Sequence, residues 1–499
     1  MELGVVTFLL DGLRLLAGEV HMIPGIHGHI DNLRLELESI YMILKEAYTR
    51  QQSNTSVSPW IRAVGQLAFE IEDVIDKYKL YAARQSSKPL RNLISFHSIG
   101  KQIEDIQKRI NDIRQIRERY REIISSQAQA SSTTTSIETR QFPKVACLFL
   151  DDPQIVGFVE PANQLVSWIG EPISMTAVIS VVGMGGTQRS RIYPSRFGKL
   201  VNLETLDLKQ TYITELSSEI LQLHRLRHLL IYRYDFLNYA AFGCVRGFSV
   251  HGRIGGLTTL QKLAFVKASM ETRIIDDLQN LTQLRKLGIV EVRRESGEYL
   301  CLSIEKMQSL HTLSITSESM EEYLDLNTLS HPPRHLQRLY LKGQLERMPR
   351  WISELQNLVR IRLKWSKLSD DPTEALQDLP TLLDLQLLDA YTGSELLFSE
   401  GKFKKLKILE FNQLRNLRKV MMDNGTLPQL QKLIIRSCPL LTAVPIGIDN
   451  LTQLEELYLH DMTETFINGI QKNGGKYRRM VNHIPIIHSY SLGSFTNLS

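Results

Sequence analysis

Two patterns of apolar residues divide this chain. Over the first 124 residues, apolar residues recur at spacings of three and four, which places them along one face of a helix. Turn-forming residues separate the apolar runs at Pro24-Gly25, between Ser53 and Pro59, and between Ser86 and Pro89. The pattern predicts four antiparallel helices with short connections, a four-helix bundle over residues 1–124.

A repeated unit, Leu-x-x-Leu-x-Leu, replaces this pattern in the second half of the chain, with Ile or Phe sometimes in place of Leu. The last two apolar positions recur at Leu206/Leu208, Leu229/Ile231, Leu263/Phe265, Leu287/Ile289, Leu313/Ile315, Leu339/Leu341, Ile361/Leu363, Leu385/Leu387, Leu409/Phe411, Leu433/Ile435 and Leu457/Leu459. One such unit cannot bury its leucines alone, so neighbouring units must stack. We predict an α/β leucine-rich-repeat solenoid over residues 192–470 and a C-terminal tail over 471–499.

The spacing of the repeats is a constant 24 residues from Ile361 onward but varies before it. The longest step runs from Ile231 to Leu263 and contains five glycines between Tyr232 and Gly256. We predict an expanded loop there, and one irregular repeat could lie within it. The whole chain is therefore expected to be multi-domain, with a four-helix bundle followed by a solenoid.

The residues between the ladder leucines point away from the core, because side chains alternate along a strand. Two neighbouring predicted strands carry Arg338, Tyr340, Lys342, Arg360, Arg362 and Lys364 there, and Trp365 follows. Basic residues beside aromatic ones are typical of sites that bind another protein, although a solvated surface has the same composition. Nucleic acid is not expected, because no basic stripe follows the whole solenoid.

The segment between the two halves, residues 125–191, combines a polar Ser/Thr-rich stretch with the start of a phosphate-binding loop. Val178–Val182 has the composition of a buried strand, and Gly183, Gly185 and Gly186 follow it. The Gly-Lys-Ser/Thr ending that would hold phosphate and magnesium is absent, since Thr187-Gln188-Arg189 stands in its place. We predict a flexible linker with a degenerate remnant of a nucleotide site, and no bound cofactor.

Composition and charge add few constraints. The net charge of +5 over 499 residues does not indicate nucleic acid. The four cysteines and thirteen histidines form no metal-ligand or catalytic motif, so neither a metal site nor an enzyme is expected. No apolar run is long enough to span a membrane, and the first residues lack the basic start of a signal peptide. We expect an intracellular protein.

The third predicted helix carries an acidic motif, Glu72-Asp73-Val74-Ile75-Asp76. In that position it resembles the signature of the coiled-coil domain of plant nucleotide-binding leucine-rich-repeat disease-resistance proteins. The resemblance implies that Glu72, Asp73 and Asp76 dock against arginines on early repeats. The matching candidates here are Arg225, Arg227 and Arg233. Read without the resemblance, the motif is more typical of a solvated helix face.

Further stretches carry the same resemblance. Asp151–Phe158 is similar to the segment that leads into the family's nucleotide-binding domain, and Val481–Pro485 resembles a family ending. Residues 1–20 resemble the family's first helix, which can insert into a membrane, although packing into the bundle remains an open alternative. Most of the family's nucleotide-binding domain has no counterpart between Gly186 and the repeats.

The resemblance implies a cytoplasmic defence-response protein, peripheral at the plasma membrane if residues 1–20 engage lipid. We expect a protein-interaction module, as a truncated immune receptor, a regulator or a decoy. Its partners would be pathogen effectors, guarded host proteins or related receptors. Two alternatives follow from the family: an ADP/ATP-dependent immune switch and a membrane-active signalling oligomer.

Overall fold

The computed structural model describes residues 105–106, 108, 200–209, 211, 213–234, 241–268, 274–491 and 494–498. The chain divides into two units, one of Met1–Leu148 with Tyr234–Cys244 and one of Phe149–Arg233 with Val245–Ser499. The described part of the second unit is the predicted solenoid. The predicted bundle and the predicted linker lie outside the described residues, apart from three helical residues that include the buried Ile106.

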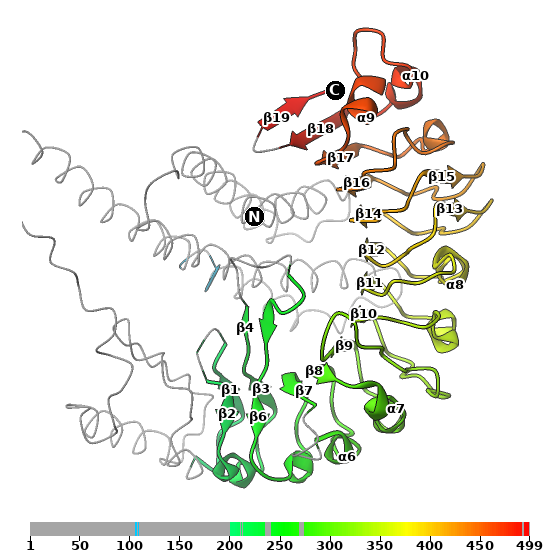
Figure 1. Ribbon diagram of the computed structural model, residues 1–499. Coiled ribbons are helices and arrows are strands. Elements are labelled where there is room, and N and C mark those ends of the chain that lie inside the picture. Colours follow the sequence, from blue (N-terminus) through cyan, green and yellow to red (C-terminus); the bar gives the residue numbers. More distant parts are fainter. Residues whose placement is uncertain are drawn as a thin grey trace, which may run out of the picture. The chain divides into compact units, whose positions relative to one another are not determined.

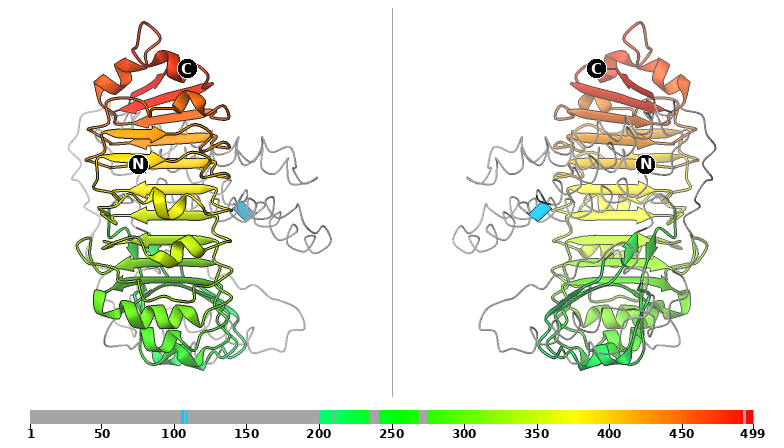
Figure 2. Two further views of the ribbon diagram at one scale, coloured as in Figure 1. Left: turned by 90° about the vertical axis from the view of Figure 1, so that its right-hand side faces the viewer. Right: turned by 90° about the vertical axis from the view of Figure 1, so that its left-hand side faces the viewer.

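One sheet of thirteen strands runs through the described solenoid. In spatial order its strands are β1 (Thr205–Asp207), β3 (His228–Leu230), β7 (Lys262–Lys267), β8 (Lys286–Val292), β9 (Thr312–Ser317), β10 (Arg338–Lys342), β11 (Arg360–Lys364), β12 (Asp384–Leu388), β14 (Ile408–Asn412), β16 (Lys432–Arg436), β17 (Glu456–His460), β18 (Ile486–Ser491) and β19 (Ser494–Asn497). Every neighbouring pair is parallel except β18 with β19. The strands lie one above another and line the inner side of a curve (Figures 1 and 2).

Short elements connect the strands. The α-helices are α6 (Ile274–Leu278), α7 (Gly297–Glu305), α8 (Thr373–Leu376), α9 (Glu464–Gly469) and α10 (Arg478–Val481). The 3-10 helices are η6 (Ser218–Gln222), η8 (Ile254–Gly256), η10 (Arg294–Ser296), η11 (Arg350–Glu354) and η12 (Ile448–Asn450). The remaining strands are β2 (Glu215–Leu216), β4 (Arg233–Tyr234), β5 (Val245–Arg246), β6 (Ser249–Val250), β13 (Glu395–Phe398) and β15 (Lys419–Met422). Helices α6, α7 and α8 lie on the outer side of the curve (Figure 1).

The ladder leucines form the core, as the repeat pattern predicts. Leu339 pairs with Ile361 and Leu341 with Leu363 across β10 and β11, and all four side chains are fully buried. The same register continues down the sheet, so one continuous apolar core runs from repeat to repeat. Fully burying a leucine contributes about 1.5–3 kcal/mol, and each repeat realises this gain only against its neighbours.

The third repeat departs from the predicted register. Phe265 has a left-handed backbone (φ 58°) and is only half-buried, whereas Val266 is fully buried and pairs with Ile289. The prediction that Phe265 is a ladder residue is therefore wrong, because a β-bulge moves that role to Val266. The backbone of Phe248 makes hydrogen bonds to the residues on either side of Val266, where the bulge lies. The Phe248 N–H donates to the Phe265 carbonyl, and the Lys267 N–H donates to the Phe248 carbonyl.

The expanded loop before this repeat adds no strand to the main sheet. Strand β3 pairs directly with β7, so the loop inserts no rung between them in the main sheet. Instead, β6 pairs with β2 (Glu215 with Ser249). Gly247 lets the chain before β6 lie close to Phe265 in β7, because a Cβ at Gly247 would lie 2.1 Å from the Phe265 carbonyl oxygen.

A left-handed residue ends most of the later strands. One such residue follows directly after each of β11, β12, β14, β16 and β17, with φ between 47° and 54°. In that order they are Trp365, Asp389, Gln413, Ser437 and Asp461. The 24-residue period thus repeats a backbone conformation as well as a hydrophobic pattern.

The sheet continues beyond residue 470, into the predicted tail. Strand β18 pairs in parallel with β17, and β19 returns antiparallel to it. Ile487 is fully buried in the position of a ladder residue. Arg478 supports this end, since its Nη1 donates to the carbonyl of Leu498 and its Nε donates to the Asn482 side chain at 2.7 Å.

Candidate protein-binding surface

The six concave-face candidates lie on two adjacent strands. Arg338 pairs with Arg360, Tyr340 with Arg362, and Lys342 with Lys364 in the register of β10 and β11. We call Arg338, Lys342, Arg360, Arg362 and Lys364 the basic block. Neighbouring strands are about 4.8 Å apart, and alternate residues on one strand are about 7 Å apart. Five cationic side chains are therefore concentrated on a small area of the inner face.

The ladder residues fix the direction of these side chains. Arg338, Tyr340 and Lys342 alternate with the fully buried Leu339 and Leu341, so all three must point away from the core. On β11 the ladder residues Ile361 and Leu363 are buried in the same way, and Arg360, which is ion-paired with Asp384, is buried as well, at 5% exposure. The loops and the core together hold the block in place.

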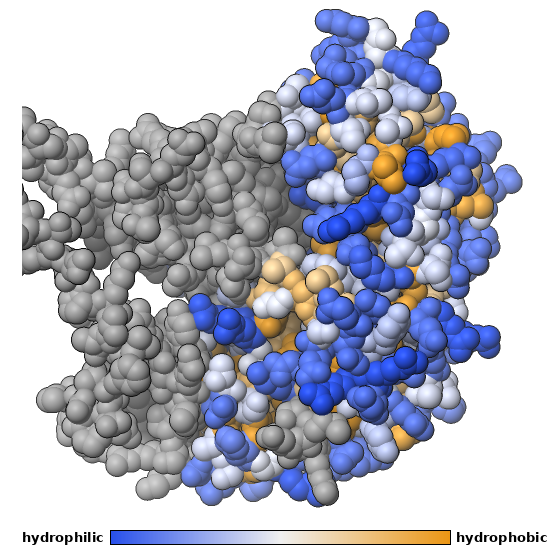
Figure 3. Space-filling view, viewed as in Figure 1, coloured by the Kyte–Doolittle hydropathy of each residue, from blue (hydrophilic) through white to orange (hydrophobic). Residues whose placement is uncertain are grey.

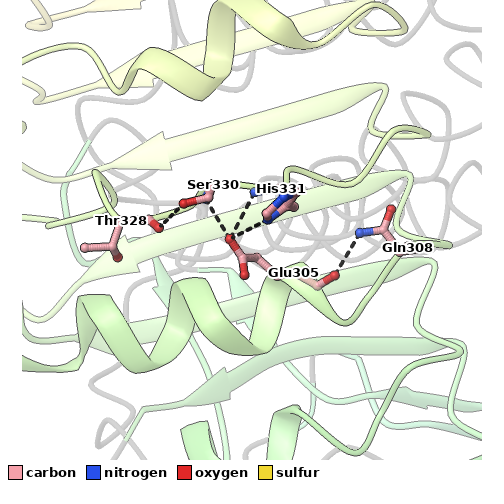
Figure 4. Close-up of polar contacts among 5 residues, drawn as sticks. All are labelled: Glu305, Gln308, Thr328, Ser330 and His331. Carbon is pink, nitrogen blue, oxygen red and sulfur yellow. Dashed lines mark hydrogen bonds and ion pairs between the residues drawn. The ribbon is translucent and has the colours of Figure 1, made fainter.

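A carboxylate fixes the loop that leads into β10. Glu305, at the end of α7, accepts hydrogen bonds from the backbone N–H groups of Ser330 (2.6 Å) and His331 (3.0 Å). The His331 ring lies 3.9 Å from the same oxygen, whereas the Ser330 hydroxyl donates to the Thr328 carbonyl (Figure 4). The side chain of Gln308 donates to the carbonyl of Glu305 (2.8 Å). These contacts join the end of α7 to the loop at Ser330 and His331 that precedes β10.

Two aromatic rings support cations of the block. The Arg362 guanidinium lies over the Tyr340 ring at 5.4 Å from its centre, and the Lys342 ammonium lies over the Trp365 ring at 5.1 Å. A cation near a ring face is attracted by the negative face of the ring. Trp365 is only 6% exposed, so its ring serves as a buried support for Lys342.

The strands after the block carry charges of both signs. Arg360 Nε lies 2.7 Å from Asp384 Oδ2 on β12, and Lys432 Nζ lies 3.0 Å from Glu456 Oε2. Arg436 Nε lies 3.1 Å from Glu410 Oε1. From β12 to β17 the inner face thus pairs acids with bases, and Lys267 on β7 likewise lies 2.8 Å from Glu291 on β8.

A cluster of rings at the end of the sheet was not predicted. The rings of Tyr458 and His460 on β17 stand beside those of His488 and Tyr490 on β18, and His460 stacks on Tyr490 at 4.7 Å with 8° between their planes. Burial, followed by the charges of nearby cations, lowers the pKa of His460 to about 2. The His460 ring therefore stays uncharged at neutral pH. Its sequence signal was the alternation Tyr-x-His in β17 and His-x-Tyr in β18.

The other predicted site residues do not form one site in the described structure. Arg225 and Arg227 are exposed before β3, and Arg227 lies 3.6 Å from Glu204, whereas Arg233 lies beyond the other end of β3, in β4. The acidic residues Glu72, Asp73 and Asp76 lie outside the described residues, as do Gly183, Gly185 and Gly186.

In the part of the chain that the structure describes, no group of three or more His, Cys, Asp and Glu side chains could hold a metal ion. Cys244, Cys301 and Cys438 are buried free thiols. In the same residues, no helix combines the length and the hydropathy needed to cross a membrane. Apolar residues occur in separate groups among hydrophilic ones on the side shown in Figure 3.

Comparison with known proteins identifies the repeats. A family model described as leucine-rich repeat region matches residues 182–464, more than half of the chain. The chain belongs to the leucine-rich-repeat family. A second model, the Rx N-terminal domain, matches residues 5–109. A leucine-rich-repeat protein of Leptospira interrogans has 19% identity over 60% of this chain and 92% of its own, with a TM-score of 0.30.

Curated relatives of this leucine-rich-repeat chain are plant disease-resistance proteins. Disease resistance protein RPM1 of Arabidopsis thaliana is 38% identical over 266 residues, which cover 53% of this chain and 28% of RPM1. Disease resistance protein Pik-2 of Oryza sativa subsp. japonica is 26% identical over 368 residues, 62% of this chain and 36% of Pik-2. These findings support a resistance protein of the coiled-coil, nucleotide-binding, leucine-rich-repeat type. The chain spans about a third of the length of these relatives.

Proposed function

We propose that this chain acts in plant defence as a protein-interaction module whose repeats bind a partner protein through their concave face. The disease-resistance relatives support the setting. The observation that carries the proposal is the basic block, where five cations and Tyr340 share the concave face of β10 and β11. Large side chains held in place by packing are the kind that dominate the binding energy of protein interfaces.

The restrained side chains make this surface suited to binding. Arg362 is held over Tyr340 and Lys342 over Trp365, so these cations have lost part of their rotamer freedom before a partner arrives. Ordering a long side chain costs about 0.5–1.5 kcal/mol on binding.

The finer role that we propose is a truncated immune receptor, regulator or decoy in the cytoplasm. Its partners would be pathogen effectors, guarded host proteins or related receptors. Residues 1–20 would provide any contact with the plasma membrane. We also propose that Glu72, Asp73 and Asp76 dock against Arg225 and Arg227. The separation of Arg233 from these two arginines by β3 makes it the weakest member of that set.

Co-purification from pathogen-treated leaf tissue tests the binding role. The bait is the full chain, compared with the double variant Tyr340→Ala/Arg362→Ala. The control variant is Lys404→Ala/Lys405→Ala, which removes two exposed cations from the loop before β14. We expect specific proteins that the wild type and the control retain and the concave-face variant loses. Equal recovery by all three chains would show that the concave face of β10 and β11 is not the binding surface.

A further inference from the structure

Three asparagines of this chain are followed directly by a glycine: Asn424, Asn468 and Asn473. In such a pair the backbone nitrogen of the glycine can attack the side-chain amide of the asparagine. Glycine favours this reaction because it has no Cβ to obstruct the approach and its backbone turns easily. The structure places the three pairs in different surroundings, and these surroundings decide which pair can react.

Asn424 and Gly425 form the exposed tip of a four-residue turn, Asp423–Thr426, which follows directly after β15. The Thr426 N–H closes the turn by donating to the Asp423 carbonyl at 3.2 Å. Gly425 has φ 72°, the left-handed value of the third residue of a type II turn, whose own N–H is not used by the turn. Among the described residues, nothing lies within 4 Å of the position of a Cβ on Gly425. The attacking nitrogen and the space around it are therefore both available.

Asn468 lies inside helix α9 and is much more restricted. Its Oδ1 accepts a hydrogen bond from Gln471 Nε2 at 3.0 Å, which holds the side-chain amide toward Gln471. Gly469 is buried, and a Cβ on it would lie 2.8 Å from the ring of Tyr477. The last turn of α9 must therefore open before Asn468 can react.

Asn473 is exposed, as Asn424 is, but its glycine is engaged. The Gly474 N–H donates to the Lys472 carbonyl at 3.1 Å. The nitrogen must give up this hydrogen bond before it can attack, which slows the reaction relative to Asn424.

We propose that Asn424 is a site of spontaneous deamidation in the folded protein. The Gly425 nitrogen forms a bond to Cγ of Asn424 while the bond from Cγ to Nδ2 breaks. The proton of the Gly425 N–H leaves with the NH2 group as ammonia, and a cyclic imide remains. Water then opens the imide at one of its two carbonyl carbons, which gives either aspartate or isoaspartate. The step needs no other reactant than water.

The preceding repeat indicates how the turn responds to the aspartyl product. Residues Ser399–Lys402 form the equivalent turn, in which the Lys402 N–H donates to the Ser399 carbonyl at 3.3 Å and Gly401 has φ 69°. Glu400 occupies the position of Asn424, because β13 and β15 pair in register directly before the two turns. The turn thus accepts an acidic residue, and aspartate adds one negative charge beside β15, on the outer side of the curve (Figure 1).

The test compares the full chain, folded at pH 8, with the same chain unfolded in guanidinium chloride. Both are digested after increasing times, and mass spectrometry follows the replacement of NH2 by OH at each asparagine. In the unfolded chain the three sites should react at similar rates, because each precedes a glycine. In the folded chain Asn424 should react faster than Asn473 and at least about tenfold faster than Asn468, because an opening cost of about 1.4 kcal/mol slows a reaction tenfold.

Two variants test the role of the turn. Glu400→Asn places a second asparagine before a glycine in the equivalent turn, and it should be deamidated at a rate similar to that of Asn424. Asn424→Gln should abolish the modification at that position, because its longer side chain must form a larger ring. Circular dichroism and the thermal unfolding midpoint show whether both variants fold.

Three results would each overturn the proposal. Asn424 could remain unmodified in the folded chain while it reacts in guanidinium chloride. Asn468 or Asn473 could react before Asn424 in the folded chain. The asparagine introduced by Glu400→Asn could remain unmodified in a chain that folds, which would show that the turn does not provide the reactive geometry.

Discussion

An ion pair on the outer side of the solenoid should respond unequally to the loss of its two members. Asp277 in α6 is 1% exposed, whereas the side chain of Arg253, before η8, is 69% exposed. The Arg253 guanidinium donates from Nε at 2.9 Å to Asp277 Oδ1, and its Nη2 lies 2.8 Å from the same oxygen. The Gly255 N–H donates to Oδ2 at 3.3 Å. The pair joins two successive repeats, and only its acidic member is desolvated.

The unequal burial of Asp277 and Arg253 sets how much free energy of unfolding each substitution should cost. Arg253→Met leaves a buried carboxylate with one long hydrogen bond, and such a loss costs about 3–5 kcal/mol for a fully buried pair. Because Arg253 is mostly exposed, we reduce this to about 2–3 kcal/mol. Asp277→Asn keeps an acceptor for Gly255 and releases Arg253 into water, so it should cost only about 1 kcal/mol. The double variant should also cost about 1 kcal/mol, much less than the sum.

Urea unfolding of the full chain, followed by far-ultraviolet circular dichroism, measures these differences. Lys402→Met is the control, because Lys402 and Asp378 form a more exposed ion pair of similar length, 2.8 Å, whose loss should cost less than about 1 kcal/mol. A larger cost for Asp277→Asn than for Arg253→Met would refute the reasoning. So would a double variant whose cost equals the sum of the single costs.

Three further predictions concern single residues. Gln413 is left-handed, so Gln413→Gly should raise the free energy of unfolding by up to about 1 kcal/mol and Gln413→Val should lower it, measured by urea unfolding. Burial raises the pKa of Cys438 to about 11, so in the folded chain at pH 8 a thiol reagent should modify it at least about a hundredfold more slowly than in urea. The pKa of His460 is lowered to about 2, so the unfolded chain takes up a proton that the folded chain does not. The free energy of unfolding should therefore fall by up to about 2 kcal/mol as the pH falls from 7 to 5, and His460→Gln should lack that part of the fall.

The sequence predicted the solenoid because the ladder positions carry the same physical demand in every repeat. An apolar residue at each of them is needed to fill one shared core, so the period is visible without any knowledge of the loops. The basic block followed from the same alternation, since residues between Leu339 and Leu341 can only face outward. The pattern could not show which outward-facing residues lie opposite each other on neighbouring strands, because that depends on the register between the strands.

The features that were missed depend on contacts distant in the sequence. Phe265 satisfies the repeat pattern, but a backbone contact with Phe248 creates the bulge that replaces it with Val266. Strand β18 was overlooked as a rung because the buried apolar residues leading into it, Val481, Ile484 and Ile487, are spaced by three without the final Leu-x-Leu. The separation of Arg233 from Arg225 and Arg227 likewise required the strand between them.

Site-specific photo-crosslinking tests the central claim most directly, which is that β10 and β11 form the partner-binding surface. A photoreactive amino acid is placed at Tyr340 of the full chain, and at Lys404 in a control, and both chains are expressed in leaf cells. We predict a crosslinked partner protein from position 340 that is absent from position 404 and is reduced by Lys342→Glu/Lys364→Glu. The claim is contradicted if position 340 yields no crosslink while position 404 yields one, or if the two positions crosslink the same proteins equally.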